Sequence, residues 1–470
     1  MSLNDALTLY RDSGIYPFHM PGHKRNPFFC GGYNGFNTDI TEIDGFDNLH
    51  DAGGIIASEM RSAARLYGSE RSFYLINGST CGILAGVFAC TRKKDKILAA
   101  RNCHKSVYNA IALRELEPVW LMHSYEHKLG IAGSISPAAV EAALTANTGI
   151  SLVIITSPTY EGVTSDIAAI AQITHKHNIP LLVDEAHGAH FGFAKAFPRS
   201  SVQCGADIVV HGLHKTLPSP TQTALLHING DRVDADEVRR QLAVFESSSP
   251  SYILMAGISG CIQLMAREGE KLFKDYTARL DDFFSQISAL RSIRVFCKEN
   301  KRDIYDFDRG KLIISVKNTD ITGTELKKRL LDRYLLQTEM AMGDYVLAMT
   351  SICDTDEGFL RLGDALLETD RLLSTTPSRQ NARVYNPETV MIPSEAISAE
   401  GSLISLSSSA GAVSKEYVYA FPPGIPLIAP GERITEDIIY ELNRLHTIGI
   451  TVKSCHGRIP SEIYTVKSSR

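Results

Sequence analysis

Residues 181–187 read LLVDEAH, and residues 207–215 read DIVVHGLHK. Each stretch is a short apolar run that ends in polar side chains, and Lys215 lies 31 residues after Asp184 (215 − 184). An apolar run without alternation is typical of a strand buried on both faces of a parallel sheet. The interval fits about one helix–strand unit, and ligand groups in such sheets follow the carboxyl ends of strands. We therefore expect Asp184 and Lys215 at strand ends of one sheet.

The same alternation of strand-like and helix-like segments extends from about residue 55 to residue 300. Strands that are apolar throughout, separated by helix-length segments, predict an α/β fold with a mostly parallel sheet that is covered on both faces. Strands are expected at 96–100, 152–156, 181–185, 207–210 and 223–228, and helices at 80–91, after Ser136-Pro137 and from about Ser165.

The chain has 470 residues, which is too long for one ordinary core, so two or three domains are expected. A long helix at about 250–292 should lead into a smaller α+β domain, and a polar run after Thr375 is typical of a linker. The predicted organisation is an N-terminal arm (1–54), a large cofactor-binding domain (55–300), a small α+β domain (301–375) and a C-terminal domain (385–470).

Composition excludes several classes of protein. The formal net charge is −5 and there is no basic run, which argues against a nucleic-acid or anionic-membrane partner. The sequence has neither a membrane-length apolar segment nor the apolar core of a signal peptide at its N-terminus. Its nine cysteines are scattered and form no CxxC pair, so we expect reduced thiols, no metal site and a cytoplasmic location. The DEAH run resembles a helicase motif, but no G-x-x-x-x-G-K-[ST] phosphate loop accompanies it.

Asp184 and Lys215 suggest a specific chemistry. A carboxylate at a buried strand end needs a compensating partner, and the protonated ring nitrogen of pyridoxal phosphate (PLP) is a suitable one. A partly desolvated lysine can lose its proton and attack an aldehyde. Taken singly, Asp184 could be a structural acid or a metal-binding carboxylate, and Lys215 a solvated surface residue. Their pairing at this offset favours the cofactor reading.

Two further segments follow strands. INGSTCGIL (76–84) places Gly78, Ser79 and Thr80 at the start of a helix, where N–H groups and hydroxyls can bind phosphate. Ordinary N-capping is the alternative for these residues. RNCHKSVYNA (101–110) carries His104, which could stack on a flat ring or be structural.

Taken together, the motifs resemble those of the Orn/Lys/Arg decarboxylases of PLP fold type I, over nearly the whole chain. The resemblance implies a PLP-dependent amino-acid decarboxylase with an aminotransferase-like large domain, of the short Gram-positive type that lacks an N-terminal wing and resembles arginine decarboxylase. The matching segments, in the family's order, are PFHMPGHKRNP (17–27), TEIDGFDNLHDAGGII (41–56), NGST, RNCHKS, SPTYEG (157–162), VDEAHGAH, LHK and YAFPPGIPLIAPGE (419–432).

The resemblance also implies residue roles. Lys215 would hold the cofactor as a Schiff base, with His214 beside the reacting carbon and Asp184 on the ring nitrogen. One position departs from the family pattern: Gly212 stands where a phosphate-binding serine is common, which would shift this role to His211 or Thr223. The remaining cofactor contacts implied are Ala186 and His187 beside the ring, His104 stacked on it, and Gly78, Ser79 and Thr80 on the phosphate.

The resemblance favours a basic L-amino acid as substrate, with arginine to agmatine ahead of lysine or ornithine, in polyamine synthesis. A fold type I aminotransferase or lyase is the runner-up, and a non-catalytic PLP-fold regulator is a third reading. A homodimer with a shared active site is also implied, and ESSSPSY (246–252) resembles a segment that the partner contributes. The acids that could meet the distal cation of the substrate are Glu161, Asp44, Asp47 and Glu432.

Overall fold

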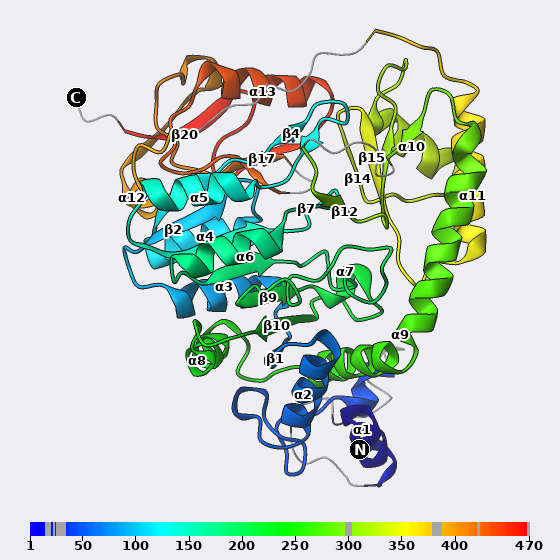
Figure 1. Cartoon of the computed structure of the whole chain (residues 1–470). Helices are drawn as coiled ribbons and strands as arrows, with labels where there is room; N and C mark the ends of the chain where they lie inside the picture. Colours follow the sequence, from blue (N-terminus) through cyan, green and yellow to red (C-terminus); the bar gives the residue numbers. More distant parts are fainter. Residues whose placement is uncertain are drawn as a thin grey trace. The chain divides into compact units, whose positions relative to one another are not determined.

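The computed structural model describes residues 1–14, 20–21, 24, 34–296, 303–377, 388–420 and 424–467. Most of the PFHMPGHKRNP segment, and most of the linker expected after Thr375, lie outside these residues. The helices and strands are labelled in Figure 1. The chain divides into two compact units. Unit 1 comprises Met1–Thr91 and Ile167–Lys274, and unit 2 comprises Arg92–Asp166 and Asp275–Arg470. Each unit is therefore assembled from two separate stretches of sequence.

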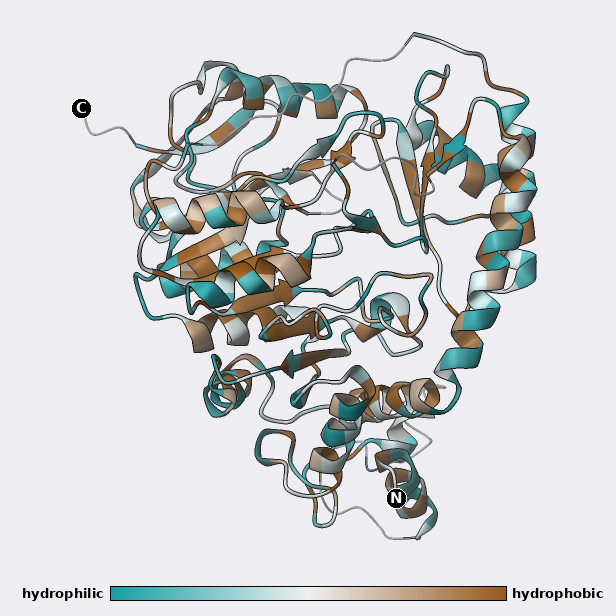
Figure 2. Ribbon diagram, viewed as in Figure 1, coloured by the Kyte–Doolittle hydropathy of each residue, from teal (hydrophilic) through white to brown (hydrophobic). Residues whose placement is uncertain are grey.

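Unit 1 contains four sheet strands, which lie in the order β1 (Arg71–Leu75), β10 (Ala224–Ile228), β9 (Ile208–His211) and β8 (Leu181–Asp184). Strands β8 and β9 are parallel, whereas β10 is antiparallel to both of its neighbours. Every residue of β8, β9 and β10 is buried, which accounts for their mostly apolar sequences (Figure 2). The polar exceptions are Asp184, His211 and His227. Because β10 alone is reversed, the carboxyl ends of β1, β8 and β9 all lie at the same edge of the sheet.

Helix α3 (Gly78–Cys90) packs closely on this sheet because two of its residues are glycines. A Cβ atom at Gly82 would lie 2.6 Å from Cδ1 of Leu75, and one at Gly86 would lie 2.6 Å from Cδ1 of Leu182. The close packing fixes the start of α3 at the edge where β1 ends. The other helices of unit 1 are α1 (Leu3–Asp12), α2 (Ile55–Tyr67), α6 (Ile167–Lys176), α7 (Leu213–Thr216) and α8 (Ala235–Phe245), and α9 (Tyr252–Gln286) runs from unit 1 into unit 2.

Unit 2 begins with three parallel strands in the order β6 (Ile150–Thr156), β2 (Lys96–Ala100) and β3 (Glu117–Leu121). Helices α4 (Lys105–Arg114) and α5 (Pro137–Ala146) belong to the same segment. An antiparallel sheet follows, in the order β11 (Arg294–Val295), β13 (Lys311–Ser315), β15 (Tyr345–Met349) and β14 (Met340–Met342), with helices α10 (Gly323–Tyr334) and α11 (Asp356–Asp370).

The C-terminal part of unit 2 has a small core of its own. Leu406, Val418, Ile428 and Ile463 are buried in it with residues of the last helix. The elements of the C-terminal part are α12 (Pro393–Ser398), α13 (Glu436–Thr447) and the strands β16 (Gly401–Ser405), β17 (Val418–Ala420), β18 (Pro426–Ile428), β19 (Val452–Ser454) and β20 (Glu462–Val466).

Candidate active site

The turn from β1 into α3 has the features of an anion site. Gly78 has φ +75°, a left-handed conformation that a glycine adopts without strain. Asn77 caps the helix without a side-chain hydrogen bond, so the first N–H groups of α3 lack a side-chain acceptor from the cap. Within the described part of the chain, the hydroxyl of Ser79 is buried and has no hydrogen-bond partner. A buried hydroxyl of this kind costs free energy unless a ligand satisfies it, and a phosphate oxygen would do so.

Asp184 is the last residue of β8 and is 5% exposed. Its Oδ1 atom accepts a hydrogen bond of 3.2 Å from the backbone N–H of Ala186, which fixes the orientation of the carboxylate. A negative charge at this depth is well placed to stabilise a cationic N–H group of a bound ligand.

Lys215 lies in the one-turn helix α7, directly after β9. Its Nζ atom lies 3.1 Å from Nε2 of His187, which follows Asp184 by three residues. His214 donates from Nδ1 to the carbonyl oxygen of Thr223 over 3.0 Å, which leaves Nε2 of the neutral ring as the proton acceptor. Burial, together with the charge of Lys215, lowers the pKa of His214, so the neutral ring is favoured.

Gly212 lies at the point where these segments meet. A Cβ atom at this position would lie 2.9 Å from the carbonyl oxygen of Ala186, 3.1 Å from Oγ of Ser79 and 3.2 Å from Cδ of Lys215. The missing serine would therefore have lain beside Ser79, in agreement with a role at the phosphate. The glycine allows the loop after β8 and the start of α3 to approach each other closely.

The two residues offered as substitutes for that serine are engaged elsewhere. His211 is fully buried, with Nε2 at 2.8 Å from Glu185 and Nδ1 at 3.1 Å from His227. The hydroxyl of Thr223 bonds to Oγ of Ser219 and to the carbonyl oxygen of Pro220, each over 2.7 Å. The geometry therefore does not favour His211 as a phosphate ligand. Thr216, which the sequence reasoning did not consider as a phosphate ligand, lies next to Lys215. Its hydroxyl is buried and has no hydrogen-bond partner among the residues that the structure describes.

His104 belongs to unit 2, where it caps helix α4. Its Nδ1 atom accepts from the backbone N–H of Ser106 over 3.2 Å and lies 2.9 Å from the hydroxyl of the same residue. This explains why a histidine precedes the helix, and the stacking role stays a prediction from the resemblance.

Three of the four acids considered for the distal cation already have partners. Glu432 forms a buried ion pair of 2.9 Å with Arg101. Although burial raises the pKa of Asp47, backbone hydrogen bonds from Gly53 and other N–H groups before and within the first turn of α2 lower it overall. Glu161 is buried and accepts a hydrogen bond of 3.0 Å from the hydroxyl of Tyr345.

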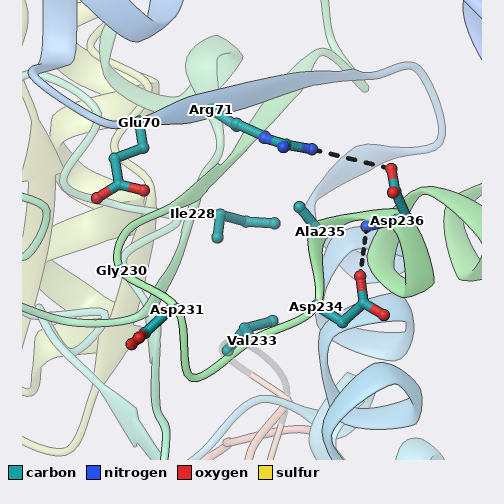
Figure 3. A pocket seen from close by; sticks show the side chains of 9 residues that line it. All are labelled: Glu70, Arg71, Ile228, Gly230, Asp231, Val233, Asp234, Ala235 and Asp236. Atoms are coloured by element: carbon teal, nitrogen blue, oxygen red, sulfur yellow. Dashed lines mark hydrogen bonds and ion pairs between the residues drawn. The ribbon is translucent and has the colours of Figure 1, made fainter.

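A separate pocket of about 250 Å³ lies at the opposite end of β1 and β10 (Figure 3). Four of its lining residues are acidic, and Arg71 forms an exposed ion pair of 3.8 Å with Asp236 there. Among the described residues, no cluster of three or more potential metal ligands occurs at this or any other place. The candidate active site is therefore the edge that carries Ser79, Asp184 and Lys215.

These residues fit PLP. The orphaned hydroxyls of Ser79 and Thr216 suit its phosphate, Asp184 suits its ring nitrogen, and the amine of Lys215 suits its aldehyde. The three groups follow strands whose carboxyl ends share one edge of the sheet in unit 1. Within the described residues, no helix is long and apolar enough to cross a membrane.

The fold is that of the PLP fold type I enzymes, since the chain superposes on the lysine decarboxylase LdcF of Francisella novicida with a TM-score of 0.84. That alignment covers 99% of this chain and 81% of that one, at 19% sequence identity. Residues 2–320 match the Orn/Lys/Arg decarboxylase major domain, and residues 376–449 match the C-terminal domain of the same family. The chain belongs to the Orn/Lys/Arg decarboxylase family, as the order of its motifs had predicted.

Relatives of similar length match almost the whole chain. The arginine decarboxylase of Halalkalibacterium halodurans is 32% identical over 449 residues, which cover 93% of this chain and 91% of the relative. The arginine decarboxylase of Bacillus subtilis is 31% identical over 465 residues, with 96% and 95% covered. The chain is therefore an amino-acid decarboxylase that acts on a basic amino acid, which confirms the predicted class of enzyme.

Proposed function

We propose that this chain decarboxylates L-arginine to agmatine with PLP bound to Lys215. The observation that carries the proposal is the placement of three groups in unit 1. The orphaned hydroxyl of Ser79, the buried carboxylate of Asp184 and the amine of Lys215 follow β1, β8 and β9 at one sheet edge. Each matches a different functional group of the cofactor. The similarity to arginine decarboxylases of nearly equal length supports arginine as the substrate.

The bound cofactor would supply the electron sink that makes loss of the α-carboxylate possible. Asp184 would keep the ring nitrogen protonated through its negative charge. Lys215 would bind the aldehyde, and the Nε2 atom of His187 would orient its amine. Nε2 of His214 would take up the proton that the substrate amine releases on binding and would donate it to Cα after the carboxylate has left as CO2, because Nδ1 of this ring is already committed to Thr223.

The distal guanidinium of arginine requires a carboxylate, because an unpaired charge costs several kcal/mol on burial. A planar guanidinium is best bound by two parallel hydrogen bonds to one carboxylate, whereas an ammonium is bound as a point charge. Glu432 and Asp47 already serve Arg101 and the start of α2. Glu161 already accepts a hydrogen bond from Tyr345, and Asp44 stays open for this role.

The test is a substrate panel assayed for CO2 release. Arginine, lysine, ornithine and neutral controls are supplied at equal concentration, and kcat/KM is compared. Arginine should lead by at least tenfold, about 1.4 kcal/mol of transition-state binding. A tenfold lead for lysine or ornithine would overturn the choice of arginine. Reaction with a neutral or acidic amino acid alone would overturn the assignment to basic substrates.

The runner-up, an aminotransferase or lyase, predicts a different product. Incubation with arginine and a keto acid would then form a new amino acid without CO2 release. The family match gives no support to this alternative, because both matching models, which together span most of the chain, are those of decarboxylases. We further propose that the enzyme is a cytoplasmic homodimer whose product feeds polyamine synthesis. The exposed segment Ser247–Ser249 follows Glu246, whose carboxylate accepts a hydrogen bond from the backbone N–H of Ile76. Ile76 lies just before the turn from β1 into α3, so this contact supports a position of the exposed segment near the candidate site.

A further inference from the structure

A chain of buried polar side chains crosses unit 1 next to the candidate active site. It begins at Glu185, directly after Asp184, and continues through His211 and His227 to Ser72. The successive heavy-atom distances are 2.8, 3.1 and 2.7 Å. All four side chains are buried, and Ser69 continues the chain toward solvent at 2.9 Å from Oγ of Ser72. None of these groups has a part in the chemistry described above.

Glu185 is well supplied with hydrogen-bond donors. Oε2 accepts from the backbone N–H and from the hydroxyl of Ser201, and Oε1 accepts from the hydroxyl of Ser200 at 2.9 Å. Oε1 also meets Nε2 of His211. Glu185 thereby joins three segments: the end of β8, the loop at 200–201 and the end of β9. The first and the last of these carry Asp184 and Lys215.

The hydrogen bonds of this chain can point in either direction. With Glu185 ionised, each neutral histidine donates from Nε2 toward the carboxylate and accepts at Nδ1, and Ser72 donates to His227. With Glu185 protonated, every bond reverses: Glu185 donates to His211, each histidine donates from Nδ1, and Ser72 becomes an acceptor. Both arrangements satisfy every buried nitrogen and oxygen between Glu185 and Ser72. Neither arrangement contains a charged imidazole.

We propose that Glu185, His211, His227 and Ser72 form a proton relay that lets Glu185 gain or lose a proton while both histidines stay neutral. In the uptake step one proton enters from solvent at Ser69. Each hydrogen bond passes its proton one position along the chain, and the carboxylate of Glu185 receives the last one. One proton is consumed and no electron moves. Glu185 is thus a positioning residue, because its bonds to β9 and to the loop at 200–201 persist in both states.

The surroundings favour two neutral histidines. Tyr67 of α2 covers both imidazoles, with ring centroids at 4.8 and 4.7 Å, and donates its hydroxyl to the carbonyl oxygen of Ala189. Burial lowers the pKa of His211 to about 3 and that of His227 well below its usual value. Burial also raises the pKa of Glu185 to about 8, against hydrogen bonds from Ser201 and Ser200. The other titratable groups that face the relay or Tyr67 are His190 in the loop after β8 and Cys261 of α9.

The test follows the tautomers of the two histidines by ¹⁵N NMR of the full-length holoenzyme, labelled in histidine. As the pH falls through the titration of Glu185, both rings should change together from Nε2–H to Nδ1–H without taking up a second proton. Glu185→Gln should hold both rings as Nδ1–H at every pH. Its amide can donate to His211 and Ser200 while its oxygen accepts from Ser201.

Asp207→Asn is the matched control, because Asp207 pairs with His175 at 2.9 Å in the same unit but outside the relay. This variant should alter the signal of His175 and leave His211 and His227 unchanged. The pH range from 5 to 9 brackets the raised pKa of Glu185. Tautomers that stay constant over this range in the wild-type protein would overturn the proposal. A doubly protonated His211 or His227 in that range would also overturn it. Both outcomes are read from the wild-type protein, so the test survives a variant that fails to fold.

Discussion

The Nζ atom of Lys215 lies 3.1 Å from Nε2 of His187, although the two residues follow different strands. His187 is reached through the loop after β8, and Lys215 lies in the single helical turn after β9. The contact therefore joins the segment of the candidate cofactor acid to the segment of the candidate cofactor lysine. A neutral imidazole nitrogen at this distance accepts a hydrogen bond from the amine and directs it.

Lys215→Ala should abolish covalent attachment of the cofactor, because it removes the amine that would bind the aldehyde. Reduction with borohydride followed by peptide mass spectrometry should find the cofactor on Lys215 in the wild-type protein and nowhere in the variant. Lys176→Ala, at an exposed position on α6, is the control and should keep the label on Lys215. A label on another lysine in the wild-type protein would contradict the assignment.

Asp184→Asn should keep the cofactor bound and lower kcat by on the order of 10²-fold or more, since it removes a buried charge. The amide oxygen can still accept the hydrogen bond from Ala186, so the local backbone is preserved. Cofactor content and single-turnover rates provide the measurement, and Asp207→Asn again serves as the buried control. Turnover within a few-fold of the wild-type value would show that Asp184 has only a structural role.

Gly212→Ala should weaken cofactor binding. The added methyl group would lie 2.9 Å from the backbone oxygen of Ala186, and overpacking of this kind costs about 1–3 kcal/mol. The dissociation constant of the cofactor, measured by titration of the cofactor-free protein, should rise by roughly tenfold. Gly358→Ala, where a Cβ meets nothing closer than 3.6 Å, should leave it unchanged. Tighter binding in Gly212→Ser than in the wild type would refute this steric account.

The fold should lose stability as the pH rises from 6.5 to 8. Glu185 has a pKa raised from 4.5 to about 8, so its stabilising contribution is complete below pH 4.5 and disappears as the pH passes 8. Below pH 6.5 the two buried histidines act in the opposite direction, because their pKa values are lowered in the fold. Between pH 6.5 and pH 8 the free energy of unfolding should therefore fall by about 2 kcal/mol.

The measurement is the denaturant midpoint of the cofactor-free protein at pH 6.5 and at pH 8.5. The midpoint should fall across this interval in the wild-type protein and stay nearly constant in Glu185→Gln. An equal fall in both proteins would assign the effect to other groups.

Mixing a Lys215→Ala chain with a Ser248→Ala, Ser249→Ala chain should restore activity if the active site is shared between two copies. Both serines are exposed in the single chain, so they are accessible to a partner. Recovery should approach a quarter of the wild-type activity for random exchange, because one hybrid site in each mixed dimer is intact. Full activity of a monomer in sedimentation would exclude a shared site.

The positions of the strands were predictable from the sequence, whereas the direction of one of them was not. The strand at 96–100 and the helix start at Pro137 were predicted correctly, because an unbroken apolar run and a Ser-Pro cap are local signals. β10 is antiparallel to both of its neighbours, and a fully buried strand has the same apolar sequence in either direction. Its direction is decided by the connections and the packing of the sheet.

The candidate site was predictable where a residue acts through its own chemistry. Asp184, Lys215 and Ser79 fall at one sheet edge because each lies at the end of a strand or shortly after it. The pairing of His211 with Glu185 and His227 was not predictable, because it depends on the register between β9 and β10. Glu185 was overlooked for the same reason, although an acid directly after Asp184 at a buried strand end is a visible signal.

The ion pair of Arg101 with Glu432 has a consequence for the synthesis of the protein. Its two members are 331 residues apart, and both side chains are buried. A ribosome adding ~5–20 residues per second needs on the order of tens of seconds to cover this interval. All residues of unit 1 have been synthesised at residue 274, whereas Arg101 of unit 2 can pair with Glu432 only after residue 432 has been added. A chain that ends before residue 432 therefore lacks the carboxylate that pairs with the buried Arg101.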